Sequence, residues 1–594
     1  MKAKRNDPLV DFSRSPHAAV RPVPLSSVEL TGFWGRRGAI NREAAIPHGL
    51  RMLEETGGIE AFEIAAGASQ AALRGFVYRD SDLYKWLEAA AYAGVRETET
   101  IIRKIAAAQT ADGYVNTSFA NENSSKRFTN LAVNHEIYCA GHLIQAGIAQ
   151  SRARCEDSLL DIAKKFADFL YAEFGPEGHV GTGGHPVAEM ALVELFRHIG
   201  DQKYLDLAHR FIEARGRGVL GGKEYLQDHA PFLNQKAAVG HAVRALYLYA
   251  GAADYYLESG DEQYLGTLET LYEDVKQKTY LTGGIGARHE GEAFGEPYEL
   301  PDSRAYAETC AVIASMMWNW RMFAATAHPK YLDDIEIAMY NGFLSGMSAY
   351  GLSYFYVNPL ASSGGHQRQP WYDCACCPPN IYRTIASIKG MFFAQNRTDL
   401  YCNFYDACSI ETQNLKLKMQ TDYPASGSVS ICVESITDFR LHLRIPSWSR
   451  EAKISWDHRS ATAPPGFFTV ENPKNVQIEF AMSPEFVFTH PRIGDKAALR
   501  RGPIIYCAES IDNPGCDIDD LCLNPDNPIS TSQPGPDSIP RLKASARSYD
   551  ASPDLYQFQQ PKTQPEEIAI NAVPYYSWAN RGPGKMRVWF PICR

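Results

Sequence analysis

Three cysteines lie within four residues of one another, and this spacing is typical of a site that uses sulfur chemistry. Cys374, Cys376 and Cys377 directly precede two prolines. Closely spaced thiolates can share one soft metal ion, or one of them can act as a nucleophile. Proline lacks a backbone donor and disfavours helix in the residue before it. We therefore expect Pro378 and Pro379 to hold the cysteines in a stiff, non-helical loop.

A second pair of metal-binding residue types lies upstream, at Glu308 and Cys310. Zinc prefers four ligands drawn from cysteine, histidine and carboxylate, so these two residues with Cys376 and Cys377 would form a Cys3Glu set. Residues two apart on a regular helix point about 200° away from each other, so we expect Glu308 and Cys310 to lie in a first helical turn or an irregular segment. A closed structural zinc site and buried free cysteines are the alternatives.

A reactive thiolate beside a carboxylic acid is the pair that double displacement at a sugar requires. One group attacks the anomeric carbon, and the other protonates the leaving oxygen and later activates water. Glu292, Glu296 and Glu299 stand in a loop-like stretch just before Glu308. From composition alone, the simpler interpretation of each is a solvated surface carboxylate.

Several histidines stand in polar, glycine-flanked contexts in which a ring nitrogen can hydrogen-bond a sugar hydroxyl. They are His135, His142, His185 and His241. The simpler interpretation of each is a core or capping histidine whose hydrogen bonds are satisfied within the protein.

The composition predicts a globular protein of several domains. Apolar residues make up 45% of the 594 residues, and the formal net charge is −10 without a long basic run. This balance argues against nucleic acid or an anionic membrane as a partner. The sequence has no run of about 18 apolar residues, so we expect no membrane span. The basic start lacks an apolar segment, and the 13 cysteines are scattered. We therefore expect a cytoplasmic, reducing location, where clustered cysteines bind metal or react.

Helical patterns dominate the chain to about residue 350, after a strand and turn predicted over residues 26–36. One helix is indicated by apolar spacing from Leu83, with Ser81 as its N-cap and Gly94 as its stop.

An internal repeat punctuates these helices. The pattern Gly-Asp-x-x-Tyr-Leu occurs at residues 200–205 and 260–265, with a looser copy at 328–332. Recurring helix–turn–helix units predict stacked helix pairs. The stack is either an open solenoid or a closed α/α toroid. Glycine-rich loops at 181–185 and 282–286 favour a toroid with an active-site mouth.

From about residue 395 the apolar period changes to two, as at Val429, Ile431 and Val433, which predicts the strands of a β-sandwich. Residues 511–545 are rich in Pro, Asp, Asn and Ser, which indicates a long loop or linker, and a last β-like segment runs over 566–589. The chain is divided on these grounds into an N-terminal arm (1–30), a helical catalytic domain (31–394), a β-sandwich (395–510) and a linker with a C-terminal β domain (511–594).

Motifs along nearly the whole chain resemble those of glycoside hydrolase family 127, whose best-known members are β-L-arabinofuranosidases. The most specific are the Cys-Ala-Cys-Cys-Pro-Pro-Asn motif and the Glu-x-Cys motif paired with it. The similar stretches are residues 374–380, 306–310, 291–294, 356–359, 135–136, 501–507 and 574–582.

The resemblance implies an (α/α)6 catalytic barrel followed by β-sandwich domains. It implies a retaining mechanism in which Cys376 is the nucleophile and Glu292 is the general acid/base. The zinc (Zn2+) ligands that it implies are Glu308, Cys310, Cys376 and Cys377. The sugar-pocket residues that it implies are His135, His185, His241 and Tyr356.

One stretch departs from the family pattern. The chain has Ile-Pro-His-Gly at residues 46–49, where arabinofuranosidase members of the family carry a glutamine after the Ile-Pro-aromatic stretch. A missing pocket amide leaves the exact sugar open.

The expected function is a cytoplasmic, zinc-dependent, retaining exo-glycosidase that removes terminal β-L-arabinofuranosides from small oligosaccharides or glycosides. One alternative is a glycosidase for another furanose such as aceric acid, whose carboxylate would require an arginine or lysine in the pocket. The other is a non-catalytic carbohydrate-binding protein with a structural zinc. By analogy alone, β-sandwich appendages suggest a homodimer.

Overall fold

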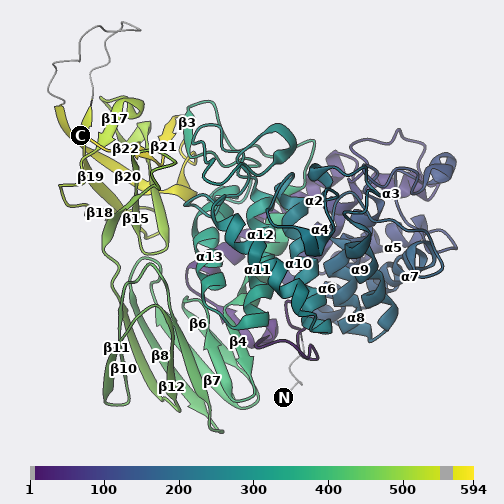
Figure 1. The fold of residues 1–594 in the computed structure, drawn as a ribbon, viewed down its shortest axis with the longest axis horizontal. Helices are drawn as coiled ribbons and strands as arrows, with labels where there is room; N and C mark the ends of the chain where they lie inside the picture. Colours follow the sequence, from purple (N-terminus) through teal and green to yellow (C-terminus); the bar gives the residue numbers. More distant parts are fainter. Residues whose placement is uncertain (1–6, 549–565, 594) are drawn as a thin grey trace, which may run out of the picture.

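The computed structural model describes residues 7–548 and 566–593, and it divides into a helical domain and a β-rich part (Figure 1). Strands 393–480, drawn in green, form one β region, and strands from residue 484 onward, drawn in yellow-green to yellow, form another. No helix of the described residues combines the length and apolarity needed to cross a membrane.

The helical domain is a closed double ring, which confirms the toroid. Neighbouring inner helices contact each other, and the last contacts the first. The inner helices are α4 (Asp80–Ala93), α6 (Glu136–Arg154), α8 (Ala188–Ile199), α10 (Ala242–Ser259), α12 (Thr309–Thr326) and α14 (Cys377–Ser387). The remaining helices are α1 (Phe33–Ile40), α2 (Ile46–Glu55), α3 (Glu60–Ala65), α5 (Glu99–Ala108), α7 (Ser158–Phe174), α9 (Gln202–Ala214), α11 (Glu262–Lys276) and α13 (Lys330–Ala338). This arrangement is an (α/α)6 barrel.

The internal repeat is a helix stop followed by a helix start. Gly200 and Gly260 end α8 and α10 in the left-handed conformation, with φ of 87° and 70°. Glycine adopts this conformation without a steric penalty. Asp201 and Asp261 then cap α9 and α11, each accepting a hydrogen bond from the backbone amide two residues on, at 3.2 and 3.0 Å.

Two predicted helix starts are displaced, while Gly94 ends α4 as expected with φ of 76°. Helix α4 begins at Asp80, so Ser81 lies inside its first turn and is not the cap. Helix α1 begins at Phe33, within the stretch expected to be strand and turn. The carboxylate of Asp406 accepts the Phe33 amide at 2.7 Å, so a residue far along the chain caps this helix.

Two antiparallel-rich sheets form the first β region and recruit strands from the N-terminal arm. One contains β1 (Arg21–Pro22), β4 (Phe393–Asn396), β5 (Asp399–Cys402), β9 (Arg440–Ile445) and β12 (Gly466–Glu471). The other contains β11 (Arg459–Ala463), β10 (Ala452–Trp456), β13 (Asn475–Phe480), β8 (Ser428–Ser435), β7 (Leu415–Thr421), β6 (Cys408–Glu411) and β2 (Val28–Leu30). Burial alternates residue by residue along β13, as the period of two predicts.

A third sheet contains strands from both sides of the expected division at residue 510. It contains β14 (Pro484–Phe488), β15 (Lys496–Arg501), β16 (Ile504–Glu509), β20 (Glu566–Pro574), β19 (Pro540–Ser548), β17 (Leu521–Leu523), β18 (Ser530–Pro534), β21 (Lys585–Arg587), β22 (Phe590–Pro591) and β3 (Ala361–Ser363). Strands β14 to β16 therefore pair with the C-terminal strands. The polar stretch expected to be a linker contains β17, β18 and part of β19, and its polarity suits the exposed β18.

A disulfide joins Cys522 of β17 to Cys593, which lies two residues after β22. This pair differs from the reduced state expected for the scattered cysteines. The clustered cysteines at residues 374–377 are free thiols, as expected.

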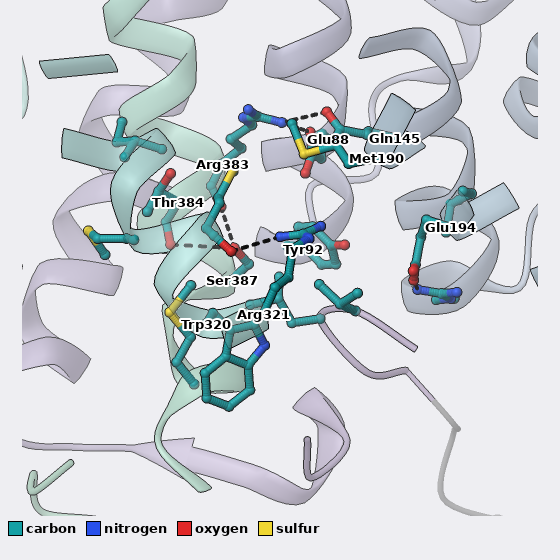
Figure 2. A pocket seen from close by; sticks show the side chains of 18 residues that line it. Glu88, Tyr92, Gln145, Met190, Glu194, Trp320, Arg321, Arg383, Thr384 and Ser387 are labelled. Carbon is teal, nitrogen blue, oxygen red and sulfur yellow. Dashed lines mark hydrogen bonds and ion pairs between the residues drawn. The ribbon is translucent and has the colours of Figure 1, made fainter. Parts of the chain in front are cut away.

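Arg383 joins four inner helices, and Figure 2 shows its side chain beside Glu88 and Gln145. From α14 its guanidinium donates to Glu88 of α4 at 2.8 Å, Gln145 of α6 at 2.9 Å and Tyr247 of α10 at 3.1 Å. Arg383 and Glu88 also line a cavity with Met190 and other residues deep in the barrel.

Arg383→Met is expected to destabilise the barrel by about 3–5 kcal/mol, because it leaves the buried Glu88 carboxylate without its cation. Chemical denaturation followed by tryptophan fluorescence measures the effect. The double variant Arg383→Met/Glu88→Gln should recover part of the loss, since it removes the uncompensated charge. A single variant as stable as the wild type would contradict the assigned role.

Candidate active site

The residues at one end of the barrel come from equivalent positions, next to the starts of inner helices. His135, His241, Glu308 and Cys376 are the N-cap residues of α6, α10, α12 and α14. His185 lies three residues before α8. Helix N-termini carry partial positive charge, which favours thiolates and carboxylates at this end of the ring.

Glu308, Cys310, Cys376 and Cys377 form a compact cluster whose donor atoms all lie within 4.8 Å of one another. The sulfur of Cys376 lies 3.8 Å from those of Cys310 and Cys377, and the latter two are 3.3 Å apart. One carboxylate oxygen of Glu308 lies 3.8 Å from the sulfurs of Cys376 and Cys377. A tetrahedral zinc with zinc–sulfur distances of about 2.3 Å separates its sulfurs by about 3.8 Å. The donor set therefore fits zinc.

The local backbone explains how the side chains of Glu308 and Cys310 reach the same cluster. Glu308 is extended, with φ of −62° and ψ of 136°, and Cys310 lies in the first turn of α12. The expected irregular segment is confirmed. The prolines do not extend a loop, because α14 begins at Cys377 and both prolines lie in its first turn. Proline is favoured there, since the first helical amides have no acceptor within the helix.

The charge of the cluster also calls for a cation. Burial raises the pKa of the Glu308 carboxyl, and the Cys376 thiolate and Glu292 raise it further. Its second oxygen is buried and has no hydrogen-bond partner among the described residues. Burial raises the pKa of Cys310 too, but its hydrogen bonds with Cys376 and Cys377 outweigh burial and lower that pKa to about 6. A bound divalent cation would offset this crowding of negative groups.

Lys85 of α4 places a buried positive charge next to the backbone of Cys376. Its ammonium group donates to the Asp82 carboxylate at 3.0 Å and to the backbone carbonyl of Cys376 at 3.4 Å. Only 1% of Lys85 is exposed. The contact ties α4 to the start of α14.

Glu292 is the one glutamate of its loop that faces the cluster. Its carboxylate lies 2.7 Å from Nε2 of His241. Glu299 instead accepts from Arg288 at 2.8 Å, and the side chain of Glu296 is 79% exposed. Glu292 itself has a positive φ of 51° and follows Gly291 at 70°, a backbone that glycine permits.

The hydrogen bonds of His241 set the charge of Glu292. Nδ1 of His241 accepts the Val243 amide at 3.2 Å, so in the neutral ring the proton is on Nε2 and is donated to Glu292. Burial raises the pKa of Glu292, but the hydrogen bond from His241 and the charge of Arg244 lower it more, and the net shift is downward. Glu292 therefore rests as a carboxylate.

Two further histidines present unprotonated nitrogens to the pocket. Nδ1 of His135 donates to the Val133 carbonyl at 2.5 Å, and Nδ1 of His185 donates to the Pro186 carbonyl at 2.9 Å. Burial lowers the pKa of His135 to about 4 and that of His185 well below its usual value, and Arg244 adds to both shifts. Their Nε2 atoms are therefore hydrogen-bond acceptors.

One pocket collects nearly all of the residues predicted from the sequence. The predicted residues that line it are His135, His185, His241, Glu292, Glu308, Cys310, Tyr356 and Cys376. Cys377 lies fully buried behind them. The Tyr356 hydroxyl lies 3.2 Å from the sulfur of Cys376. His142 does not line the pocket; it is buried beside Tyr138.

Sequence reasoning missed further pocket residues. They are Tyr78, Tyr138, Tyr225, Val243, Arg244 and Tyr247. Cys374, which the sequence placed in the cysteine cluster without a defined role, also lines the pocket. Arg244 follows His241 by three residues on one helix, so the two share a face, and helical spacing was the available signal. Tyr225 lies in a short 3-10 helix, Glu224–Leu226, before α10, and nothing local indicates that it reaches the pocket.

The departure at residues 46–49 is explained by packing. A Cβ at Gly49 would lie 2.4 Å from the Tyr382 ring, so no side chain fits there. Neither His48 nor Gly49 lines the pocket. Helix α2 therefore contributes no side-chain amide to the pocket.

Comparison with known proteins covers the whole described architecture. The model of the "Beta-L-arabinofuranosidase, GH127 catalytic domain" matches residues 27–390, and those of the family 127 middle and C-terminal domains match 399–478 and 484–591. The non-reducing end β-L-arabinofuranosidase of Bifidobacterium longum is 32% identical over 600 residues, which is 89% of this chain and 91% of that protein.

Solved structures agree. The GH127 β-L-arabinofuranosidase from Geobacillus stearothermophilus T6 is 35% identical, with a TM-score of 0.90, and the match covers 95% of this chain and 100% of that one. A second GH127 β-arabinofuranosidase is 34% identical, also with a TM-score of 0.90, over 97% of this chain and 98% of that one. Fold and site together define a glycoside hydrolase built on an (α/α)6 barrel. The chain belongs to glycoside hydrolase family 127.

Proposed function

We propose that this enzyme removes terminal β-L-arabinofuranosyl groups with retention of configuration, with Cys376 as nucleophile and Glu292 as general acid/base. The observation that carries the proposal is that both groups line one pocket with three histidines and Tyr356. The similar proteins named above are β-L-arabinofuranosidases, which supports the choice of sugar.

The reaction proceeds in two displacements. The Cys376 thiolate attacks the anomeric carbon and the carbon–oxygen bond to the leaving group breaks. The protonated form of Glu292, which is the minor form at rest, gives its proton to the leaving oxygen. In the second step the Glu292 carboxylate takes a proton from water, the water oxygen bonds to the anomeric carbon, and the carbon–sulfur bond breaks. Two inversions give net retention.

Zinc fits the Cys3Glu donor set, and Glu308, Cys310, Cys376 and Cys377 would hold it. When bound, it keeps thiols deprotonated near neutral pH. The protein's own groups position the nucleophile, through the Lys85 contact to the Cys376 carbonyl and the Tyr356 hydroxyl beside the Cys376 sulfur.

The pocket histidines suit a neutral sugar. The Nε2 acceptors of His135 and His185 can receive hydrogen bonds from sugar hydroxyls, and neutral rings add no charge beside the nucleophile. The site is a pocket at one end of the barrel, which suits removal of a terminal residue.

The test is hydrolysis of an aryl β-L-arabinofuranoside by protein whose zinc content has been measured, with the first-formed anomer identified by NMR. Release of the β-anomer is expected. First release of the α-anomer would overturn double displacement. No hydrolysis by zinc-loaded protein would overturn the assigned sugar.

An acidic furanose such as aceric acid is the second candidate, and Arg244 favours it. Arg244 lines the pocket, is only 5% exposed, and forms no ion pair with a carboxylate among the described residues. A buried cation of this kind suits a substrate carboxylate. Assay of both sugars on one preparation decides between the candidates.

A further inference from the structure

An arc of aromatic rings runs along the pocket wall and ends at Tyr225. Successive ring centroids are 5.0 Å apart for Tyr78 and His135, 6.1 Å for His135 and His185, 5.7 Å for His185 and His241, and 5.5 Å for His241 and Tyr225. Tyr225 is 39% exposed, whereas His241 beside it is 5% exposed. Tyr225 therefore stands where the pocket opens to solvent.

The ring of Tyr225 is fixed by its neighbours on the protein side. The Arg244 guanidinium lies 4.4 Å from the ring centroid and donates to the Tyr225 hydroxyl at 3.3 Å. A planar cation over an aromatic ring is a favourable contact that helps to hold the ring in place. The exposed part of the ring remains available to a ligand.

Tyr225 also lies beside the general acid/base of the proposed function. A Cβ at Gly291 would lie 3.5 Å from the Tyr225 ring, so the ring packs over the residue that directly precedes Glu292. Glu292 in turn contacts His241, the ring next to Tyr225 in the arc. The acid and the aromatic ring thus share one side of the pocket mouth.

Double displacement decides what passes this ring. The nucleophile and the acid act on opposite sides of the anomeric carbon, so the leaving oxygen must lie against Glu292. Whatever that oxygen carries extends from Glu292 toward solvent. The side chain that it meets there is Tyr225, a large, rigid group with an exposed aromatic surface.

We propose that Tyr225 forms the aglycone subsite, where the next sugar ring of an oligosaccharide stacks on its exposed surface. The ligand class is a neutral sugar ring joined through the scissile oxygen. This inference rests on the proposed function, because it takes Glu292 as the group that faces the leaving oxygen.

The test compares two substrates that share the glycosyl group and differ in the aglycone, a β-L-arabinofuranosyl disaccharide and methyl β-L-arabinofuranoside. Tyr225→Ala is expected to lower the ratio of kcat/KM for the disaccharide to that for the methyl glycoside by about tenfold, a typical value for losing one aromatic contact. Tyr225→Phe, which keeps the ring and removes the hydroxyl that Arg244 contacts, should preserve the ratio. Tyr350→Ala, at a tyrosine that is 74% exposed and outside the pocket, is the matched control.

The outcomes separate the two proposals. An equal loss on both substrates would mean that Tyr225 acts only through Glu292 or Arg244, and it would overturn the subsite while leaving the glycosidase assignment intact. An unchanged ratio would overturn the subsite as well. If the wild-type enzyme hydrolyses neither substrate, the proposed function fails and the subsite fails with it.

Discussion

Cys376→Ser is expected to abolish turnover while leaving the fold intact. A serine hydroxyl at the same position stays protonated near neutral pH, so it cannot replace a thiolate as the nucleophile. Loss of a nucleophile typically costs a factor on the order of 10⁴ or more in kcat. Steady-state kinetics on an aryl β-L-arabinofuranoside measure the loss, and circular dichroism with thermal melting checks the fold.

Matched cysteine variants make this result specific. Cys432→Ser, at an exposed thiol of the β region, controls for the substitution itself. Cys374→Ser tests the other cysteine that lines the pocket, whose sulfur lies 3.8 Å from the Tyr356 hydroxyl. Full activity of Cys376→Ser would contradict the nucleophile assignment. Inactivity of Cys374→Ser alone would move the role to Cys374.

The features that the sequence predicted well depend on local chemistry. Gly200 ends one helix through its own backbone conformation, and Asp201 starts the next through its side chain. The repeat therefore marked helix boundaries in the sequence. The donor types of Glu308 and Cys310 imposed an irregular backbone, because a helix cannot aim both at one point. In each case the deciding interaction lies within a few residues.

The features that were missed depend on partners distant in the chain. The cap of α1 is Asp406, more than 370 residues away, so no local pattern marks Phe33 as a helix start. Alternating burial is the same in any sheet, so it did not show that β14 to β16 pair with the C-terminal strands. The polar stretch at 511–545 contains the exposed strand β18, whose composition resembles that of a loop.

The site itself lies between these extremes. Its residues occupy equivalent positions at the N-termini of inner helices, and this regularity appears only once the helix starts are known. The grouping of Glu308, Cys310, Cys376 and Cys377 was predictable from residue type, and their donor atoms lie within 4.8 Å of one another. Tyr225 was not, because its position depends on how its loop meets the Gly291 turn.

Glu292→Gln is expected to separate substrates by their leaving groups. Glutamine keeps the shape of the side chain but cannot transfer a proton, so hydrolysis of the methyl glycoside should fall by about 10²–10⁴-fold. A dinitrophenyl glycoside needs no protonation to leave, and its first step should be largely spared. The second step still lacks its base, so the glycosyl-enzyme should accumulate after a burst of dinitrophenol, and azide should restore turnover by attacking it directly.

The pH dependence gives an independent check on the same residue. The first step needs protonated Glu292, and the hydrogen bond from His241 together with the nearby Arg244 charge lowers its pKa despite burial. The protonated fraction therefore falls as pH rises, and it does so at lower pH than for an ordinary glutamic acid. Wild-type kcat/KM on the methyl glycoside should therefore decline as pH rises through the pKa of Glu292. The kcat/KM of Glu292→Gln on the dinitrophenyl glycoside should not show this decline.

Glu299→Gln is the matched control, because Glu299 belongs to the same loop but pairs with Arg288 and does not line the pocket. It should retain the wild-type ratio between the two substrates and the wild-type pH limb. An equal loss on both substrates in Glu292→Gln, with no rescue by azide, would count against the acid/base role. Glu292 would then act through His241 and the shape of the pocket, since the two side chains share a hydrogen bond of 2.7 Å.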